Sequence, residues 1–282
     1  PAGEVFPGPD EAELKAGQYY DEWVPNDHCF VKDDSDQWHL FGITHPRTDL
    51  QFVHAGENQS LHAVAPRGPL KQALQAGAWQ DRAKVLPPAE RPGEPREQHA
   101  PVIVRRDGPY QMIYGPTPIR YAVSDDLYRW SPRGAVAGAP AGRDPCVLFW
   151  DDTCHLAVCG LHEVRMAASR DLRQFTGERS ILTMHGNVDP ESPTLIRHAG
   201  TFYLFVCGWD GVWDQQELDG AYQHITYVFQ SDDPWRFDAD RVLTRLDAHA
   251  PEIIQAEQGD WYIASAQYAH LGVSRARLVW DE

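Results

Sequence analysis

Polar and charged side chains stand directly before five apolar, β-type runs that are spread along most of the chain. They are Asn26 and Asp27, His99, Arg143 and Asp144, Glu191, and His249. Two carboxyl groups on either side of one bond can act as general acid and as base or nucleophile, which is the pairing that cleaves glycosidic bonds. If the fold brings Asp27, Asp144 and Glu191 together, the sequence supplies the groups for that reaction.

The elements that must position these groups form a repeat. Each copy starts with a polar pair, followed by proline in four of the five copies, and continues into the runs 26–31, 99–104, 143–148, 191–196 and 249–254. A short polar turn and a second β-rich run come next. A serine with an aromatic residue six positions later also recurs, in Ser124 and Trp130, Ser169 and Phe175, Ser231 and Phe237, and Ser274 and Trp280. Such repeats are typical of a β-propeller, in which the first strand of each blade lines a common axis.

Five copies predict an all-β protein, a five-bladed β-propeller with a single domain over residues 1–282. The copies follow one another at about 44 to 58 residues after a longer first interval of about 73. We expect an insertion in the first blade over residues 68–96, and we expect residues 1–22 to lie against the fifth blade and close the ring. Because the first strands begin at the same end of the axis, their leading polar residues must converge there.

Composition excludes two classes of partner. The 282 residues include 25 basic and 41 acidic side chains, and the formal charge of −16 repels a phosphate backbone. No apolar run approaches the length that crosses a bilayer. We expect neither nucleic acid nor a membrane as partner, whereas the ten Trp residues offer apolar faces for sugar rings if they do not serve core packing.

Cysteines and the start of the chain give weaker indications. The five cysteines contain no C-x-x-C pair, so we expect packing residues rather than a disulfide framework or a zinc site. The sequence starts at Pro1 and shows no signal peptide. We expect a cytoplasmic protein, or one from which a signal peptide has been removed.

The blade motifs resemble those of the five-bladed propeller glycoside hydrolases of families 32, 43 and 68, which include β-fructosidases, arabinanases and xylosidases. Residues 26–27 with 38–41 and Pro46 are similar to the "N-D-P … H-L-F … P" opening of family 32, residues 143–145 to its R-D-P motif, and residues 121–130 to its A-V-S-x-D-L-x-x-W segment. Residues 191–193 are closer to the E-x-P of family 43. The resemblance spans residues 23–280. It departs from family 32 at His28, where proline is expected, and in lacking a following β-sandwich.

The resemblance implies a role for each carboxyl group. Asp27 would be the nucleophile of a retaining enzyme or the general base of an inverting one, Asp144 the stabiliser of the transition state, and Glu191 the general acid. It implies no required cofactor, although His249 matches a histidine that lies by a bound calcium or water in some family 43 members. The residues expected to bind substrate are Asn26, His99, Arg143, His249 and Trp209. We expect no metal-ligating residue.

The same residues also allow structural interpretations. An aspartate at the start of a strand, such as Asp144, can bind backbone amides, and the shared H-A-P context of His99 and His249 can reflect a blade-capping hydrogen bond. We expect a glycoside hydrolase that removes a terminal β-fructofuranosyl or α-L-arabinofuranosyl group from an oligosaccharide or small glycoside, with a β-xylosyl group as the weaker option. The alternatives are a non-catalytic carbohydrate-binding propeller and a propeller that binds another protein.

Overall fold

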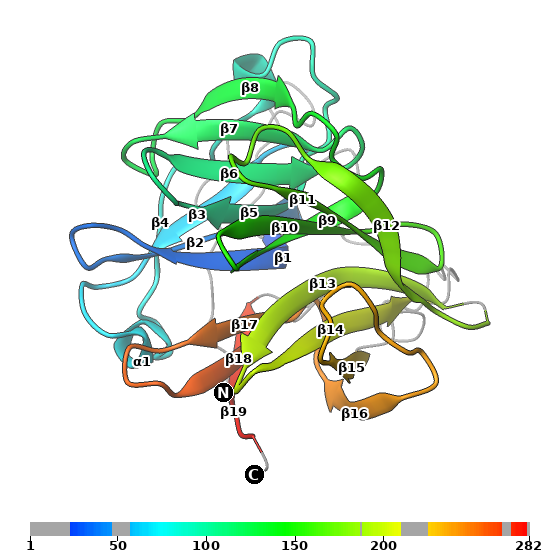
Figure 1. Cartoon of the computed structure of the whole chain (residues 1–282). Helices are drawn as coiled ribbons and strands as arrows, with labels where there is room; N and C mark the ends of the chain where they lie inside the picture. Colours follow the sequence, from blue (N-terminus) through cyan, green and yellow to red (C-terminus); the bar gives the residue numbers. More distant parts are fainter. Residues whose placement is uncertain (1–22, 47–56, 187, 210–224, 267–271, 281–282) are drawn as a thin grey trace.

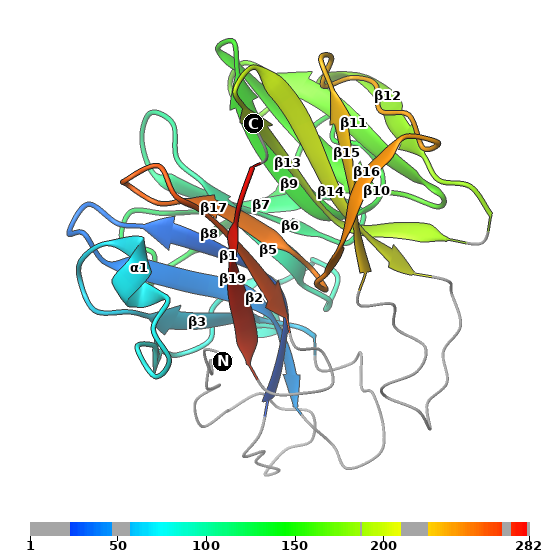
Figure 2. The same cartoon turned by 90° about the horizontal axis from the view of Figure 1, so that it is seen from below.

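The computed structural model describes residues 23–46, 57–186, 188–209, 225–266 and 272–280 as five antiparallel sheets around one axis (Figures 1 and 2). Strands pair in sequence order within each sheet, or blade. Blade one contains β1 (Trp23–Lys32), β2 (Trp38–Pro46), β3 (Ser60–Val64) and β4 (Gln80–Asp81). Blade two contains β5 (His99–Val104), β6 (Tyr110–Gly115), β7 (Arg120–Ser124) and β8 (Ser131–Ala135). Blade three contains β9 (Arg143–Trp150), β10 (Thr153–Cys159), β11 (Glu163–Ser169) and β12 (Thr176–Thr183). Blade four contains β13 (Asp189–His198), β14 (Thr201–Trp209), β15 (Ile225–Ser231) and β16 (Val242–Asp247), and blade five β17 (Glu252–Gln255), β18 (Trp261–Ala266) and β19 (Val273–Leu278).

The first strand of each blade lies at the axis. These strands contact one another in the order β1, β5, β9, β13 and β17, and β17 returns to β1. The predicted five-bladed, all-β, single-domain propeller is therefore confirmed. The stretch 68–96 contains the short helix α1 (Leu70–Ala73) and a 3₁₀ turn (Pro88–Glu90), but also β4, which pairs with β3 and completes blade one. In the part of the chain that the structure describes, no helix is long and apolar enough to cross a bilayer.

Apolar side chains hold neighbouring blades together. Among the described residues, one cluster of buried apolar side chains lies at each junction between adjacent blades. The junction that closes the ring packs Trp38 and Leu40 of blade one, with Leu70 of α1, against Ala264 and Val273 of blade five. Lys32 Nζ also lies 2.6 Å from Glu257 Oε1 across this junction. The expected contribution of residues 1–22 to closure lies outside the described residues.

The recurring serine and aromatic pair has a local explanation. The Ser124 hydroxyl accepts a hydrogen bond of 2.8 Å from the Leu127 N–H, which turns the chain after β7, and Ser169 and Ser231 accept similar bonds from Asp171 and Asp233. The aromatic residues Trp130, Phe175 and Phe237 are then buried in junction clusters. The motif thus ends the third strand of a blade and attaches the outer edge of that blade to its neighbour.

Each of the first four inner strands contains a β-bulge in its first half. The pairing register shifts between Asn26 and His28 in β1, and it also shifts at the start of β5, β9 and β13. Residues that precede proline adopt positive φ in four blades: Ala100 (42°), Asp144 (54°), Ser192 (46°) and Ala250 (46°). Gly42 faces the β1 bulge, where a Cβ would lie 3.0 Å from the Asn26 carbonyl oxygen. Bulges re-aim side chains, and these aim one residue of each blade toward the axis.

Candidate active site

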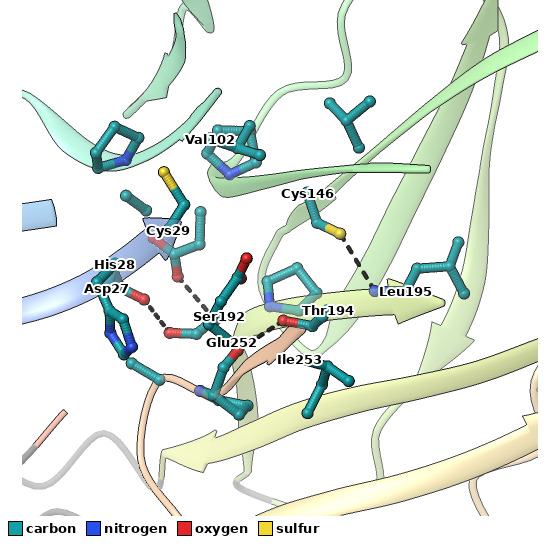
Figure 3. A pocket seen from close by; sticks show the side chains of 18 of the residues that line it. Asp27, His28, Cys29, Val102, Cys146, Ser192, Thr194, Leu195, Glu252 and Ile253 are labelled. Atoms are coloured by element: carbon teal, nitrogen blue, oxygen red, sulfur yellow. Dashed lines mark hydrogen bonds between the residues drawn. The ribbon is translucent and has the colours of Figure 1, made fainter. Parts of the chain in front are cut away.

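A pocket of about 130 Å³ lies on the propeller axis (Figure 3). Most of its lining forms three tiers with one residue from each blade, and Val147, Leu195, Ile196 and Ile253 complete it. The first tier is Asp27, Ala100, Asp144, Ser192 and Ala250; the second is His28, Pro101, Pro145, Pro193 and Pro251; the third is Cys29, Val102, Cys146, Thr194 and Glu252. Equivalent positions of the sequence repeat therefore meet in space, as a common axis requires.

The three carboxyl groups singled out in the sequence come together at the axis, where Asp27 and Asp144 line the pocket and Glu191 lies beside them. The Ser192 hydroxyl donates a hydrogen bond to Asp27 Oδ1, and the Ser192 N–H donates one of 3.1 Å to Asp144 Oδ2. Arg143 bridges the other pair, with Nη1 2.7 Å from Asp144 Oδ2 and Nη2 2.7 Å from Glu191 Oε1. Asp144 and Glu191 are buried. Blades one, three and four thus contribute one acid each to a single cluster.

The electrostatics of the cluster act most strongly on Asp27. Burial raises the pKa of Asp27 well above its usual value, and the negative charges of Asp144 and Glu191 raise it further. The Ser192 hydrogen bond and the positive charge of Arg143 oppose this rise. Asp27 therefore retains a proton above the usual pKa range of aspartate.

The remaining predicted site residues have partners within the protein. His249 Nε2 lies 3.1 Å from Asn26 Oδ1, which joins the starts of blades five and one. His99 Nε2 lies 3.0 Å from Oε2 of the buried Glu57. Burial lowers the pKa of His99, but attraction to Glu57 and to Asp144 outweighs burial and leaves that pKa raised. The side chain of Trp209, the last residue of β14, lies outside the described part of the structure.

A calcium ion bound through His249 does not fit this arrangement. The Nε2 atom of His249 faces Asn26, and Nδ1 lies 3.5 Å from the Cys207 sulfur, so both ring nitrogens are engaged. Calcium prefers six to eight oxygen ligands. Within the described ranges, no three His, Cys, Asp or Glu side chains are grouped so that they could hold a metal ion.

Three residues of the site were not singled out from the sequence. Ser192 occupies the repeat position of Asp27 and Asp144, so a comparison of equivalent blade positions would have found it. Glu252 occupies the position of Cys29 and three other uncharged residues, where a carboxyl group is unexpected. Glu57 lies outside the repeat and gives no comparable signal.

Glu252 should make stability depend on pH. Burial raises the pKa of Glu252 to about 8, against the effect of a hydrogen bond from the Phe30 backbone. The folded state therefore keeps a proton that the unfolded chain releases above its ordinary pKa near 4.5. This contribution to stability is complete below that value and is lost as the pH rises to about 8.

We expect Glu252→Gln to match the wild type at pH 4 and to exceed it by about 2 kcal/mol in free energy of unfolding at pH 9. Urea denaturation followed by tryptophan fluorescence at both pH values measures this difference. Glu90→Gln, at an exposed position, is the control. Its free energy of unfolding should differ from that of the wild type by the same amount at both pH values. A pH-independent difference for Glu252→Gln would contradict the prediction.

Comparison with known proteins gives matches to solved structures. No family model and no curated protein matches the sequence. A family 43 β-xylosidase/α-arabinofuranosidase from a compost microbial metagenome has a TM-score of 0.66 at 15% identity, covering 92% of both chains. The α-L-arabinanase of Cellvibrio cellulosa has a TM-score of 0.66 at 14% identity, covering 92% of this chain and 93% of the other. An exo-1,5-α-L-arabinanase from a bovine ruminal metagenomic library has a TM-score of 0.65 at 17% identity, covering 92% and 94%.

These matches define the class of fold. The chain has the five-bladed propeller architecture of the family 43 structures over nearly its whole length. The resemblance in the blade motifs is thereby confirmed at the level of the fold.

Proposed function

We propose that the protein is a glycoside hydrolase that removes a terminal furanosyl group, β-fructofuranosyl or α-L-arabinofuranosyl, from an oligosaccharide or small glycoside. A terminal β-xylosyl group is the weaker candidate. The observation that carries the proposal is the meeting of Asp27, Asp144 and Glu191 around Arg143 and Ser192. The proposal is supported by the similar structures, two of which hold xylotriose and arabinohexaose.

In the proposed mechanism Glu191 takes up the proton that Asp27 retains, which leaves Asp27 ionised, and then protonates the glycosidic oxygen as the bond to the leaving group breaks. Asp27 either attacks the anomeric carbon or removes a proton from the attacking water. Asp144 stabilises the positive charge that develops on the sugar ring. Arg143 Nη1 lies 2.7 Å from Asp144 Oδ2, and Nη2 lies 2.7 Å from Glu191 Oε1. Arg143 therefore fixes the position of the proton donor relative to the carboxylate that stabilises the charge on the sugar ring. This chemistry needs no cofactor.

Glu191→Gln tests the role of the proton donor. The amide keeps the shape of the side chain and can still accept a hydrogen bond from Arg143, but it has no acidic proton. We expect kcat for an aryl furanoside to fall by about 10² to 10³, and further for an oligosaccharide, because a sugar leaving group depends more on protonation. Sugar binding should stay measurable by calorimetry.

Glu163→Gln is the matched control, because Glu163 also pairs with an arginine, Arg165, but at the surface of blade three. It should leave kcat unchanged. If Glu191→Gln keeps full activity, the assignment of the proton donor is wrong. If the wild type binds sugars but hydrolyses no aryl fructofuranoside, arabinofuranoside or xyloside, the protein is a carbohydrate-binding propeller instead.

A further inference from the structure

His28 breaks the symmetry of the axial pocket. The second tier of the pocket has proline in blades two to five and His28 in blade one. Proline presents no polar side-chain atom at this position, whereas histidine presents two ring nitrogens. His28 follows Asp27 directly in the chain, and both residues line the pocket (Figure 3).

The His28 ring is buried without a hydrogen bond. The residue is 6% exposed, and neither Nδ1 nor Nε2 has a hydrogen-bond partner in the described structure. Its one described ring contact is apolar, an edge-to-face packing on Phe30 with the ring centroids 5.5 Å apart. Buried polar atoms are nearly always hydrogen-bonded, and leaving one unpaired lowers stability. Two such atoms on one ring therefore call for a partner that the described residues do not supply.

The protonation state of His28 defines what that partner must offer. Burial lowers the pKa of His28 to about 3, so the ring is neutral at neutral pH. A neutral imidazole carries one N–H donor and one acceptor nitrogen. A hydroxyl group can be the partner of either nitrogen, accepting from the N–H or donating to the acceptor nitrogen, whereas a carboxylate can only accept and an ammonium group can only donate.

We propose that His28 is a substrate-binding residue whose ring nitrogens bind hydroxyl groups of the sugar held beside Asp27. This inference rests on the proposed function, since it takes a sugar as the ligand. It explains why blade one departs from proline at this position. A site that binds a hydroxyl group leaves its own polar atoms unpaired until the ligand arrives, and it rejects ligands that lack the group.

The test replaces His28 with phenylalanine, which keeps a planar ring for the contact with Phe30 but removes both nitrogens. Binding of fructose, arabinose and xylose is measured by calorimetry in the Glu191→Gln background, and kcat/KM for an aryl glycoside in the otherwise wild-type protein. We expect binding and kcat/KM to fall by about 10- to 100-fold. The melting temperature should stay the same or rise, because the substitution removes no hydrogen bond among the residues that the structure describes.

Two further variants complete the design. His28→Gln retains a donor and an acceptor and should recover part of the affinity. His155→Phe is the matched control: His155 is 3% exposed in β10, has an Nδ1 without a hydrogen bond and packs on Trp235, but it does not line the axial pocket. His155→Phe should leave sugar binding unchanged.

The outcomes separate this inference from the proposed function. Sugar affinity within twofold of the parent in His28→Phe overturns the inference, as does a melting temperature lowered by more than about 5 °C, because the nitrogens would then have a structural partner. In either case, hydrolysis of a glycoside by the wild type would still support the proposed function. If the wild type and His155→Phe neither bind nor hydrolyse any sugar, the proposed function fails and the inference fails with it.

Discussion

Replacing Asp27 with asparagine should abolish hydrolysis and stabilise the protein at the same time. Without a carboxylate to act as base or nucleophile, we expect kcat to fall by about 10⁴, the upper end of the effect of a positioned base. The gain in stability follows from the surroundings of Asp27. Its side chain is half-buried beside Asp144 and Glu191, and this burial and both charges raise its pKa. An ionised carboxylate at position 27 is therefore repelled by the charges of Asp144 and Glu191, whereas a neutral amide is not.

The pH dependence of this gain has a definite sign. Because the folded-state pKa of Asp27 is raised, its proton stabilises the fold fully below the ordinary value near 3.8, and this contribution is lost as the pH rises through the raised pKa. Asp27→Asn has no such loss. Its melting temperature should thus exceed that of the wild type by several degrees at pH 8 and by less at pH 4, which differential scanning fluorimetry can measure.

Asp171 is a control for which the expected change in melting temperature at pH 8 has the opposite sign. It also accepts a hydrogen bond from a serine, Ser169, but it lies at the surface, where hydrogen bonds from the Arg173 and Gln174 N–H groups lower its pKa. Asp171→Asn should lower the melting temperature at pH 8 and leave kcat unchanged. Retained activity in Asp27→Asn, or a lower melting temperature at pH 8, would remove Asp27 from the proposed mechanism.

The sequence predicts the fold and the convergence of the acids for one physical reason. Blades are similar units stacked around an axis, so equivalent positions must face one another whatever the separation along the chain. Residues 27, 144 and 191 could therefore be placed at one end of the axis from the repeat alone. The positive φ of Asp144 and Ser192 could not be predicted from the repeat, because bulges depend on how each inner strand pairs with its neighbour.

Side-chain partners were harder to predict than strand positions. The contact of His249 with Asn26 depends on how tightly blades five and one close, and the contact of His99 with Glu57 involves a residue outside the repeat. Cys207 was expected to be a packing residue, and it is buried, but its sulfur also lies beside Nδ1 of His249. Such contacts depend on side-chain rotamers and inter-blade distances that no spacing in the sequence specifies.

Removing Arg143 should be the most destabilising single change at the site. Its guanidinium bridges Asp144 and Glu191, whose side chains are 4% and 7% exposed. Arg143→Met leaves both carboxylates buried without this partner, and breaking a buried ion pair from one side costs about 3 kcal/mol or more. Urea denaturation at pH 7 should show this loss in free energy of unfolding. Arg143→Lys should recover only part of it, because an ammonium group lacks the planar fork that binds two carboxylates.

The comparison with Arg165 shows why burial, rather than the number of partners, determines this cost. Arg165 also contacts two carboxylates, with Nε 3.1 Å from Glu163 Oε1 and Nη1 2.7 Å from Glu178 Oε1, but those side chains are 30% and 35% exposed. Water can replace its contacts, so Arg165→Met should cost less than about 1 kcal/mol. Equal losses for the two variants at pH 7 would mean that the carboxyl groups at the axis do not depend on Arg143, and the proposed arrangement of the proton donor would have to be abandoned.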